Sequence, residues 1–315
     1  MNTKRMLTFL VAFLVLGIAA FAVFTLYFQQ EPERNQDLVS PTLEPSPSAD
    51  VSPIPADPDN QDDQDDQEQI PDNWTHLYDG IMTYRIAYPV SWTISPAATS
   101  QGESAVQSFD PGQTPDVGGV PRNEIKVAVV FFAPGDERKP SFEDSTIVSE
   151  KPIQVGGFDA IQRVTEGGAG GSVSTEVTTP QGTYFISAYP PDSELISTYQ
   201  QILDYIDLTR QPPVKIDQPP ANMTITSPAT VSGSAPGTWF SEAVLPISLK
   251  TYDGEILAEQ TFMTEQDWMT TRQLQFSTQF EFIQPDAEVG YISIERNNPS
   301  GIPRNQTIFT WPVEF

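Results

Sequence analysis

The chain has 315 residues and carries 42 acidic against 16 basic side chains, a formal net charge of -26. Charge of this sign repels phosphate backbones, so we expect no nucleic-acid partner. Cysteine is absent, which excludes disulfides, a thiolate nucleophile and cysteine metal sites. Any exported domain must therefore be stabilised by its own apolar core.

The first predicted element is an apolar run at residues 6–28, which contains no charged side chain and directly follows Lys4 and Arg5. A bilayer core of about 30 Å needs roughly 20 apolar residues in an α-helix. Positive charge on the N-terminal flank places residues 1–5 in the cytoplasm and the rest of the chain outside. The sequence thus predicts a single-pass anchor in the cell membrane, with its C-terminal domains extracytoplasmic.

A cleaved signal peptide is the alternative interpretation of this run. Its apolar region usually has about 7 to 15 residues and ends at a small-x-small site, for which Ala20, Phe21 and Ala22 qualify. The apolar run continues past them to Phe28, which favours an uncleaved anchor. The lack of cysteine also removes a bacterial lipoprotein.

Residues 29–72 form the next predicted segment, which is rich in proline, aspartate and glutamine. Few of these side chains can offset the conformational entropy lost on folding, so the sequence predicts a disordered acidic tether. The stretch 59–69 holds most of the aspartates, but it lacks the glycine and the ordered ligand spacing of a calcium loop. We therefore assign it no metal.

Residues 73–210 are predicted to form an α+β domain. Alternating or continuously apolar stretches bounded by turn residues indicate strands. These strands are expected at 82–88, 125–132, 158–165, 172–179 and 183–189. One helix follows, capped by Asp192 or Ser193. Its apolar stripe, which must be buried against the sheet, consists of Leu195, Ile196, Tyr199, Ile202, Leu203 and Ile206.

Three parts of this domain carry a resemblance to a known fold. They are the opening segment 84–92 with its tyrosine-proline-x-x-tryptophan ending, the segment 156–160, and the closing strand and helix. Together they resemble the PsbP-like α+β fold. That fold occurs in extrinsic photosystem subunits and in many bacterial surface proteins, so the resemblance implies no single activity. We carry over no functional residue from it.

Two local features of this domain invite a catalytic or ligand-binding interpretation. The glycines between residues 167 and 171 are not followed by Lys-Ser/Thr or by a helix, so a hairpin loop is favoured over a phosphate cradle. His76 is the single histidine. At the border of the tether it would be exposed and far in sequence from an oriented serine or carboxylate, so we expect no catalytic role for it.

After a proline-rich linker at 211–221, residues 222–315 are predicted to form an all-β sandwich. Short strand candidates recur between turn signals at 224–225, 230–232, 244–251, 255–262, 274–282, 289–295 and 307–315. Asp253 and Gly254 form a strong two-residue hairpin signal between two of them. Short strands at this spacing are typical of a sandwich.

An ordered set of motifs in this region carries a second resemblance. The motifs lie at 225–228, 231–235, 237–240, 242, 253–254, 267–270 and 298–303. The segment 222–315 closely resembles the immunoglobulin-like domain that accompanies bacterial spore-germination proteins and many other exported bacterial proteins. The resemblance implies a β-sandwich that serves as an accessory binding or adhesion module, with no established catalytic residues.

Trp239, Phe240 and Trp268 are candidates for a sugar-stacking platform in this domain. Adjacent residues of a strand point to opposite faces, so Trp239 and Phe240 cannot both face a ligand there. We therefore expect core packing for at least one of them.

These observations indicate a multi-domain bacterial envelope protein that recognises a surface partner without chemistry of its own. The expected partners are the membrane, through residues 6–28, and an envelope protein or a cell-wall polymer. The sequence assigns no catalytic residue, no cofactor and no metal site. Two alternatives stay open: a wall-directed hydrolase that uses a carboxylate pair, although no spacing singles out such a pair, and an accessory subunit of a membrane complex.

Overall fold

The computed structural model describes residues 70–97, 102–110, 120–139, 142, 146–167, 171–209 and 211–315. The predicted cytoplasmic stub, the membrane anchor at 6–28 and the tether up to residue 69 lie outside this part of the chain. Among the described residues no helix has the length and apolar character needed to cross a bilayer.

One antiparallel sheet has seven strands in the order β3-β4-β5-β9-β8-β7-β6. Its strands are β3 (Thr93–Ser95), β4 (Glu103–Gln107), β5 (Lys126–Phe132), β6 (Thr146–Val155), β7 (Phe158–Glu166), β8 (Ser172–Thr179) and β9 (Gly182–Tyr189). The strands predicted at 125–132, 158–165, 172–179 and 183–189 are present, whereas β3, β4 and β6 were missed. The continuously apolar β5 lies between β4 and β9, as predicted for a central strand, and its residues Val127, Ala128 and Val129 are buried.

The helix α2 (Ile196–Asp204) packs on one face of this sheet through Tyr199, Ile202 and Leu203. The Tyr199 hydroxyl donates to the Ile186 carbonyl oxygen at 2.9 Å. The predicted capping was wrong, because the N-cap residue is Leu195 and it makes no side-chain cap bond. The Ser193 hydroxyl lies just before the helix, where it accepts the amide of Leu195 at 3.1 Å and donates to the carbonyl oxygen of Glu124 at 2.8 Å.

The second half of the chain forms a β-sandwich of two sheets. The smaller sheet contains β10 (Lys215–Gln218), β11 (Ala229–Pro236) and β14 (Gln273–Phe280). The larger sheet has the order β13-β12-β15-β16-β1-β2. Its sandwich strands are β12 (Val244–Thr251), β13 (Ile256–Met263), β15 (Val289–Glu295) and β16 (Thr307–Glu314). The apolar faces of both sheets meet in one core, which includes Val231, Leu249, Phe276 and Ile292.

Two details of the sandwich differ from the sequence-based expectations. The strand β10 lies inside the predicted proline-rich linker at 211–221, where prolines on both sides hid a four-residue strand. The strand predicted at 224–225 is only an isolated bridge between Thr224 and Glu314.

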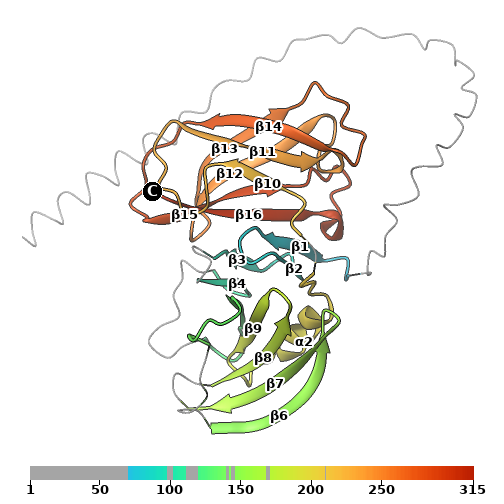
Figure 1. Cartoon of the computed structure of the whole chain (residues 1–315), viewed down its shortest axis with the longest axis vertical. Helices are drawn as coiled ribbons and strands as arrows, with labels where there is room; N and C mark the ends of the chain where they lie inside the picture. The colour runs from blue at the N-terminus through green and yellow to red at the C-terminus, as the bar shows by residue number, and fades with distance from the viewer. Residues whose placement is uncertain are drawn as a thin grey trace, which may run out of the picture. The chain divides into compact units, whose positions relative to one another are not determined.

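The first hairpin of the described chain belongs to both cores. It consists of β1 (Trp74–Asp79) and β2 (Tyr84–Pro89). The strand β1 pairs in parallel with β16, from His76 opposite Thr307 to Asp79 opposite Thr310, and Figure 1 shows this hairpin extending the sheet of β15 and β16.

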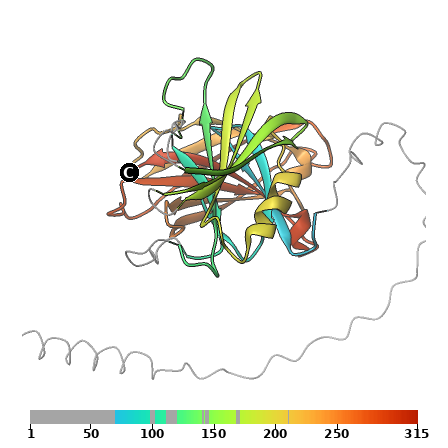
Figure 2. The same cartoon turned by 90° about the horizontal axis from the view of Figure 1, so that it is seen from below.

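Side chains of the hairpin enter the core that contains α2. Leu77, Tyr84 and Ile86 are at most 1% exposed there, and Trp74 packs edge-on against Tyr205 just after the helix. Figure 2 shows α2 beside the same hairpin. The sequence placed the strand at 82–88 wholly in the α+β domain. The structure instead joins that domain to the sandwich through a shared sheet.

Candidate binding surfaces

Three segments meet at one end of the sandwich, and we call this region the loop end (residues 237–243, 263–272 and 296–306). Backbone hydrogen bonds connect all three. The amide of Gly237 donates to the carbonyl of Arg272 at 2.9 Å, and the amide of Asn297 donates to that of Trp239 at 3.0 Å. The Asn297 side chain also donates to the Ser241 carbonyl at 3.0 Å. The loop end is therefore a packed surface built from segments distant in sequence.

Glycine is required where two of these segments touch. Gly237 begins the short 3-10 helix η1 (Gly237–Trp239). A Cβ added to Gly237 would lie 2.4 Å from the carbonyl oxygens of both Trp268 and Thr270. That separation is far below van der Waals contact, so only glycine lets the second segment approach the first.

A strained turn lies next to this contact. Ser241 and Val244 exchange both backbone hydrogen bonds, at 3.2 and 3.0 Å. The two central residues have positive φ, 52° at Glu242 and 66° at Ala243. Turns of this shape normally use Asn-Gly, and a residue with a Cβ costs about 1–2 kcal/mol in the left-handed region. Strain of this kind is concentrated at functional sites in proteins.

The third segment contains a turn that is held by its own side chains. The Asn298 side-chain amide donates to the Ile302 carbonyl at 2.8 Å, and the Ser300 hydroxyl donates to the Asn298 side-chain oxygen at 2.5 Å. Gly301 takes a φ of 64°. A loop ordered in this way loses little further entropy when a partner binds.

The loop end presents apolar side chains to solvent. Met263 is 69% exposed and Met269 is 78% exposed. Trp268 lies between them in sequence and packs partly against the sandwich core. Sequence reasoning missed both methionines, although Met269 belongs to the motif at 267–270. Methionine is a flexible and polarisable side chain that adapts to irregular partner surfaces.

The candidate sugar-stacking residues Trp239 and Phe240 do not form a solvent-facing pair at this end. Trp239 and Phe240 are only 5% and 3% exposed, and both belong to the sandwich core. Core packing is confirmed for both. The argument from strand alternation did not apply, because Trp239 ends a 3-10 helix.

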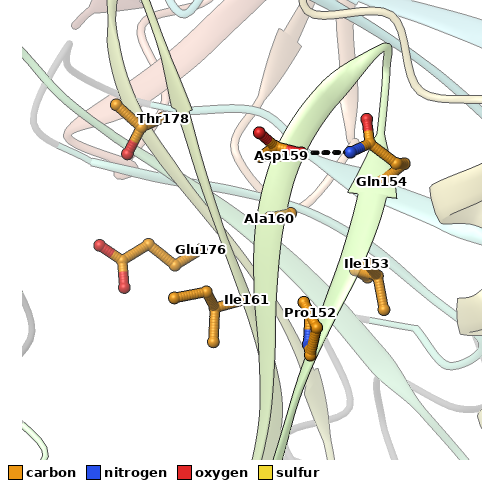
Figure 3. Close-up of a pocket in the computed structure, with 8 residues that line it drawn as sticks. All are labelled: Pro152, Ile153, Gln154, Asp159, Ala160, Ile161, Glu176 and Thr178. Atoms are coloured by element: carbon orange, nitrogen blue, oxygen red, sulfur yellow. Dashed lines mark hydrogen bonds between the residues drawn. The ribbon is translucent and has the colours of Figure 1, made fainter.

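A second surface is an open depression of about 460 Å³ over β6, β7 and β8. Figure 3 shows Ile161 and Glu176 side by side, with Thr178 on the same side of the strands. The Gln154 side-chain amide donates to the Asp159 carboxylate. Glu176 accepts from the Arg163 guanidinium at 2.8 Å. The depression thus combines apolar side chains with two carboxylates.

The buried carboxylate of Asp79 has a structural explanation. It accepts the backbone amides of Ile81 at 2.9 Å and Met82 at 2.7 Å, which fixes the turn between β1 and β2. Burial raises the pKa of Asp79, and these backbone hydrogen bonds partly oppose the rise. Tyr84 donates to the Ser104 hydroxyl at 2.7 Å beside it, and burial raises the pKa of Tyr84 well above its usual value. This polar cluster connects the hairpin to β4.

Other groups considered from the sequence do not form a catalytic arrangement in the part of the chain that the structure describes. His76 lies within β1, between β16 and β2. Gly167 and Gly171 flank the β7–β8 connection, where the Gly171 amide donates to the Gly167 carbonyl at 3.1 Å; Gly168 and Gly170 lie outside the described residues. Across the described ranges, no three acidic or histidine side chains gather to hold a metal ion.

Comparison with known protein families identifies one region of the chain. Residues 213–301 match the family of the immunoglobulin-like domain of bacterial spore germination. The match contains the first two segments of the loop end and part of the third, and it agrees with the sandwich described above. It does not extend to the α+β region, for which the PsbP-like resemblance has no support. No curated protein and no solved structure matches the chain.

Proposed function

We propose that the chain is a membrane-anchored, extracytoplasmic binding or adaptor protein of the bacterial envelope, and that the loop end is its contact surface. The observation that carries this proposal is the exposure of Met263 and Met269 on an ordered surface of the germination-type immunoglobulin-like domain. The anchor at 6–28 and the extracytoplasmic location come from the sequence and are part of the proposal.

Energetic considerations support a binding role for this surface. Full burial of one methionine side chain contributes about 1.5–3 kcal/mol. The hydrogen-bonded turn at Asn298 and the glycine contact at Gly237 hold the surrounding backbone, so little of this gain is lost to ordering on association. Anchoring would raise the local concentration near the membrane, and weak sites would then suffice.

The alternative of a carboxylate-pair hydrolase finds less support. Such an enzyme needs two carboxyl groups that face a bound glycan from opposite sides. Asp159 and Glu176 line an open depression, where Gln154 and Arg163 already bind them. We therefore favour recognition without chemistry.

Sedimentation with isolated envelope material tests the proposal. The full-length chain in a non-ionic detergent is incubated with cell walls from its own host, and the bound fraction is measured against concentration. We expect saturable binding that falls about tenfold or more in Met263→Gln/Met269→Gln, because two apolar contacts are lost. The matched control is Ile283→Gln, which removes an 89% exposed apolar side chain outside the loop end.

The outcomes separate the possible partners. Saturable sedimentation identifies a wall polymer. Absence of sedimentation, together with a methionine-dependent crosslink in intact cells, identifies an envelope protein. Equal loss in the methionine and Ile283 variants would show general adhesion and overturn the assignment of the loop end.

A deletion tests the proposed spacer. Removal of residues 31–69, which ends before the buried Ile70, is expected to impair binding in intact cells while the purified protein keeps its thermal unfolding transition. Unchanged binding in cells would count against a role for the tether.

A further inference from the structure

The depression over β6, β7 and β8 lies on the face of the sheet that α2 leaves open. Thr175 hydrogen-bonds the Tyr199 hydroxyl at 2.7 Å, so it faces the helix. Successive strand residues point to opposite faces, and Glu176 therefore points away from α2. The sheet register places Ile161 directly opposite Glu176 on one side and opposite Pro152 on the other. Apolar and acidic side chains thus form one row across three strands.

The carboxylates of the depression are held in place and remain open to a ligand. Arg163 binds Glu150 at 2.7 Å and Glu176 at 2.8 Å, which fixes the Glu176 side chain. The Gln154 side-chain amide donates a hydrogen bond to one carboxylate oxygen of Asp159, which holds that side chain as well. Two carboxylates bind the one guanidinium, and Asp159 is held by an uncharged amide, so these side chains together keep a net negative charge. The whole chain, at a net charge of -26, adds attraction for a cation at long range.

The apolar part of the row suits an aliphatic stem. Ile161 is 38% exposed, and Pro152 lies beside it at the edge of the depression. A lysine side chain has four methylenes that pack on apolar surface while its ammonium group reaches a polar partner. Its compact charge with three rotatable donors can approach carboxylates that are already bound on one side.

Exposed apolar side chains continue along the edge strand β6 beyond the depression. Ile147 and Val148 are 45% and 54% exposed on β6, which has no partner on its outer side within the described sheet. Pro152 has no amide hydrogen, so it interrupts the row of donors that an added strand would need. Recognition by side chains over the sheet face is therefore favoured over strand addition along the edge.

We propose that this depression is a second binding site, which takes a lysine side chain of an extended peptide segment from a protein partner. The lysine methylenes lie over Ile161 and Pro152, and its ammonium group meets Glu176 and Asp159. This site is separate from the loop end and does not depend on it. A protein with both sites joins two partners.

Fluorescence anisotropy with a defined probe tests the site. A labelled nine-residue peptide with alternating lysine and serine is titrated with the full-length chain in a non-ionic detergent. We expect saturable binding that weakens about tenfold in Asp159→Asn/Glu176→Gln, through the loss of two partly exposed ion pairs. The matched control is Glu259→Gln/Glu281→Gln, which removes the same charge from exposed positions in the sandwich and is expected to bind as the parent does.

A second variant is needed because Glu176→Gln also removes an ion-pair partner of Arg163. Ile161→Lys places an ammonium group inside the depression, where it competes with the peptide. We expect it to lower peptide affinity while the thermal unfolding temperature stays within about 3 °C of the parent, since Ile161 is on the surface.

Three results would overturn the proposal. One is an equal loss of affinity in the sandwich control, which would show attraction by net charge alone. Another is undiminished binding of the same peptide with acetylated lysines, which would show that the ammonium group is not recognised. The third is competition by free cadaverine at the same concentration as the peptide, which would identify a site for small amines.

Discussion

The two turns at the ends of β12 differ in the residues that take the left-handed backbone conformation. At its C-terminal end, Thr251 and Glu255 enclose a three-residue loop in which Gly254 takes the left-handed conformation, with a φ of 92°. At its N-terminal end, Glu242 and Ala243 take that conformation without any glycine. One strand therefore carries a relaxed turn and a strained turn.

The surroundings of the two turns explain the difference. Tyr252 in the relaxed turn is half-buried beside Ser95, which belongs to the edge strand β3 of the seven-stranded sheet. That turn lies at an internal contact, where glycine gives the required shape with little strain. The strained turn holds an exposed Glu242 at the loop end, beside the proposed contact surface. The strained turn thus lies beside the surface that we propose for binding, in agreement with the concentration of strain at functional sites.

The largest expected effect on stability comes from a methyl group added at Gly237, which would push apart the two loop-end segments that touch there. Gly237→Ala places a methyl group 2.4 Å from two carbonyl oxygens, so the segment 263–272 must move. We expect a loss of about 2–3 kcal/mol in the free energy of unfolding, as for other overpacked sites. Chemical denaturation measures it. The control is Gly254→Ala, where no backbone atom is close and only the positive φ is unfavourable, at about 1 kcal/mol. Equal losses would contradict the proposed close packing.

The relaxed turn is expected to stabilise the fold through the Tyr252 side chain. Tyr252→Ala removes a half-buried ring from the contact with the seven-stranded sheet. We expect a loss of about 1–2 kcal/mol in unfolding free energy, below the value for a fully buried aromatic residue. The binding that we propose for the loop end should be unchanged. A variant as stable as the parent would show that this contact contributes nothing to the fold.

Relief of strain at the loop end should stabilise the protein. Ala243→Gly removes the unfavourable left-handed Cβ, and the extra freedom of the unfolded chain offsets part of that gain. We expect a net increase of about 0.5–1 kcal/mol in unfolding free energy. Ala258→Gly in β13 is the matched control and should lose about 0.5–1 kcal/mol. A destabilised Ala243→Gly would mean that the turn is not strained.

The smallest expected effect is a change in alkaline stability. Burial raises the pKa of Tyr252, and the nearby Lys126 partly opposes the rise. The folded protein therefore keeps this proton at a pH where the unfolded chain, with a tyrosine pKa of about 10, releases it. The stabilising contribution is complete below that pH and is lost as pH rises above it. In Tyr252→Phe the stability above about pH 10 should fall less steeply than in the parent, as chemical denaturation at a series of pH values measures.

Local patterns predicted the elements whose side chains alternate or run apolar between clear turns. The strands β5, β8 and β15 and the apolar stripe of α2 belong to this group. The strand β6 was missed because most of its side chains are exposed on both faces, which leaves no period to detect. The hairpin at Asp253 was predicted with two loop residues. The structure has three, since a bulge at Leu249 and Lys250 shifts the register.

Long-range contacts account for the rest of what the sequence could not predict. The pairing of Leu77 with Ile308 and the approach of Trp268 to Gly237 depend on where separate segments meet. The motif at 267–270 marked the loop end in the sequence, but the exposure of Met269 depends on the packing of the whole loop. The depression at Glu176 follows from the register of β6, a strand that was not predicted.

The parallel pairing of β1 with β16 has a consequence for the order of synthesis. Residues 76–79 are among the first described segments to leave the ribosome, and their partners at 307–310 are among the last. The strand β1 can pair with β16 only after residues 307–310 have been synthesised. Pairing between segments so distant in sequence slows folding. A chain that stops short of residue 307 leaves the edge of β1 unpaired and open to proteases or to other chains. The N-terminal hairpin thus depends on residues 307–310 for the strand that pairs with the other edge of β1.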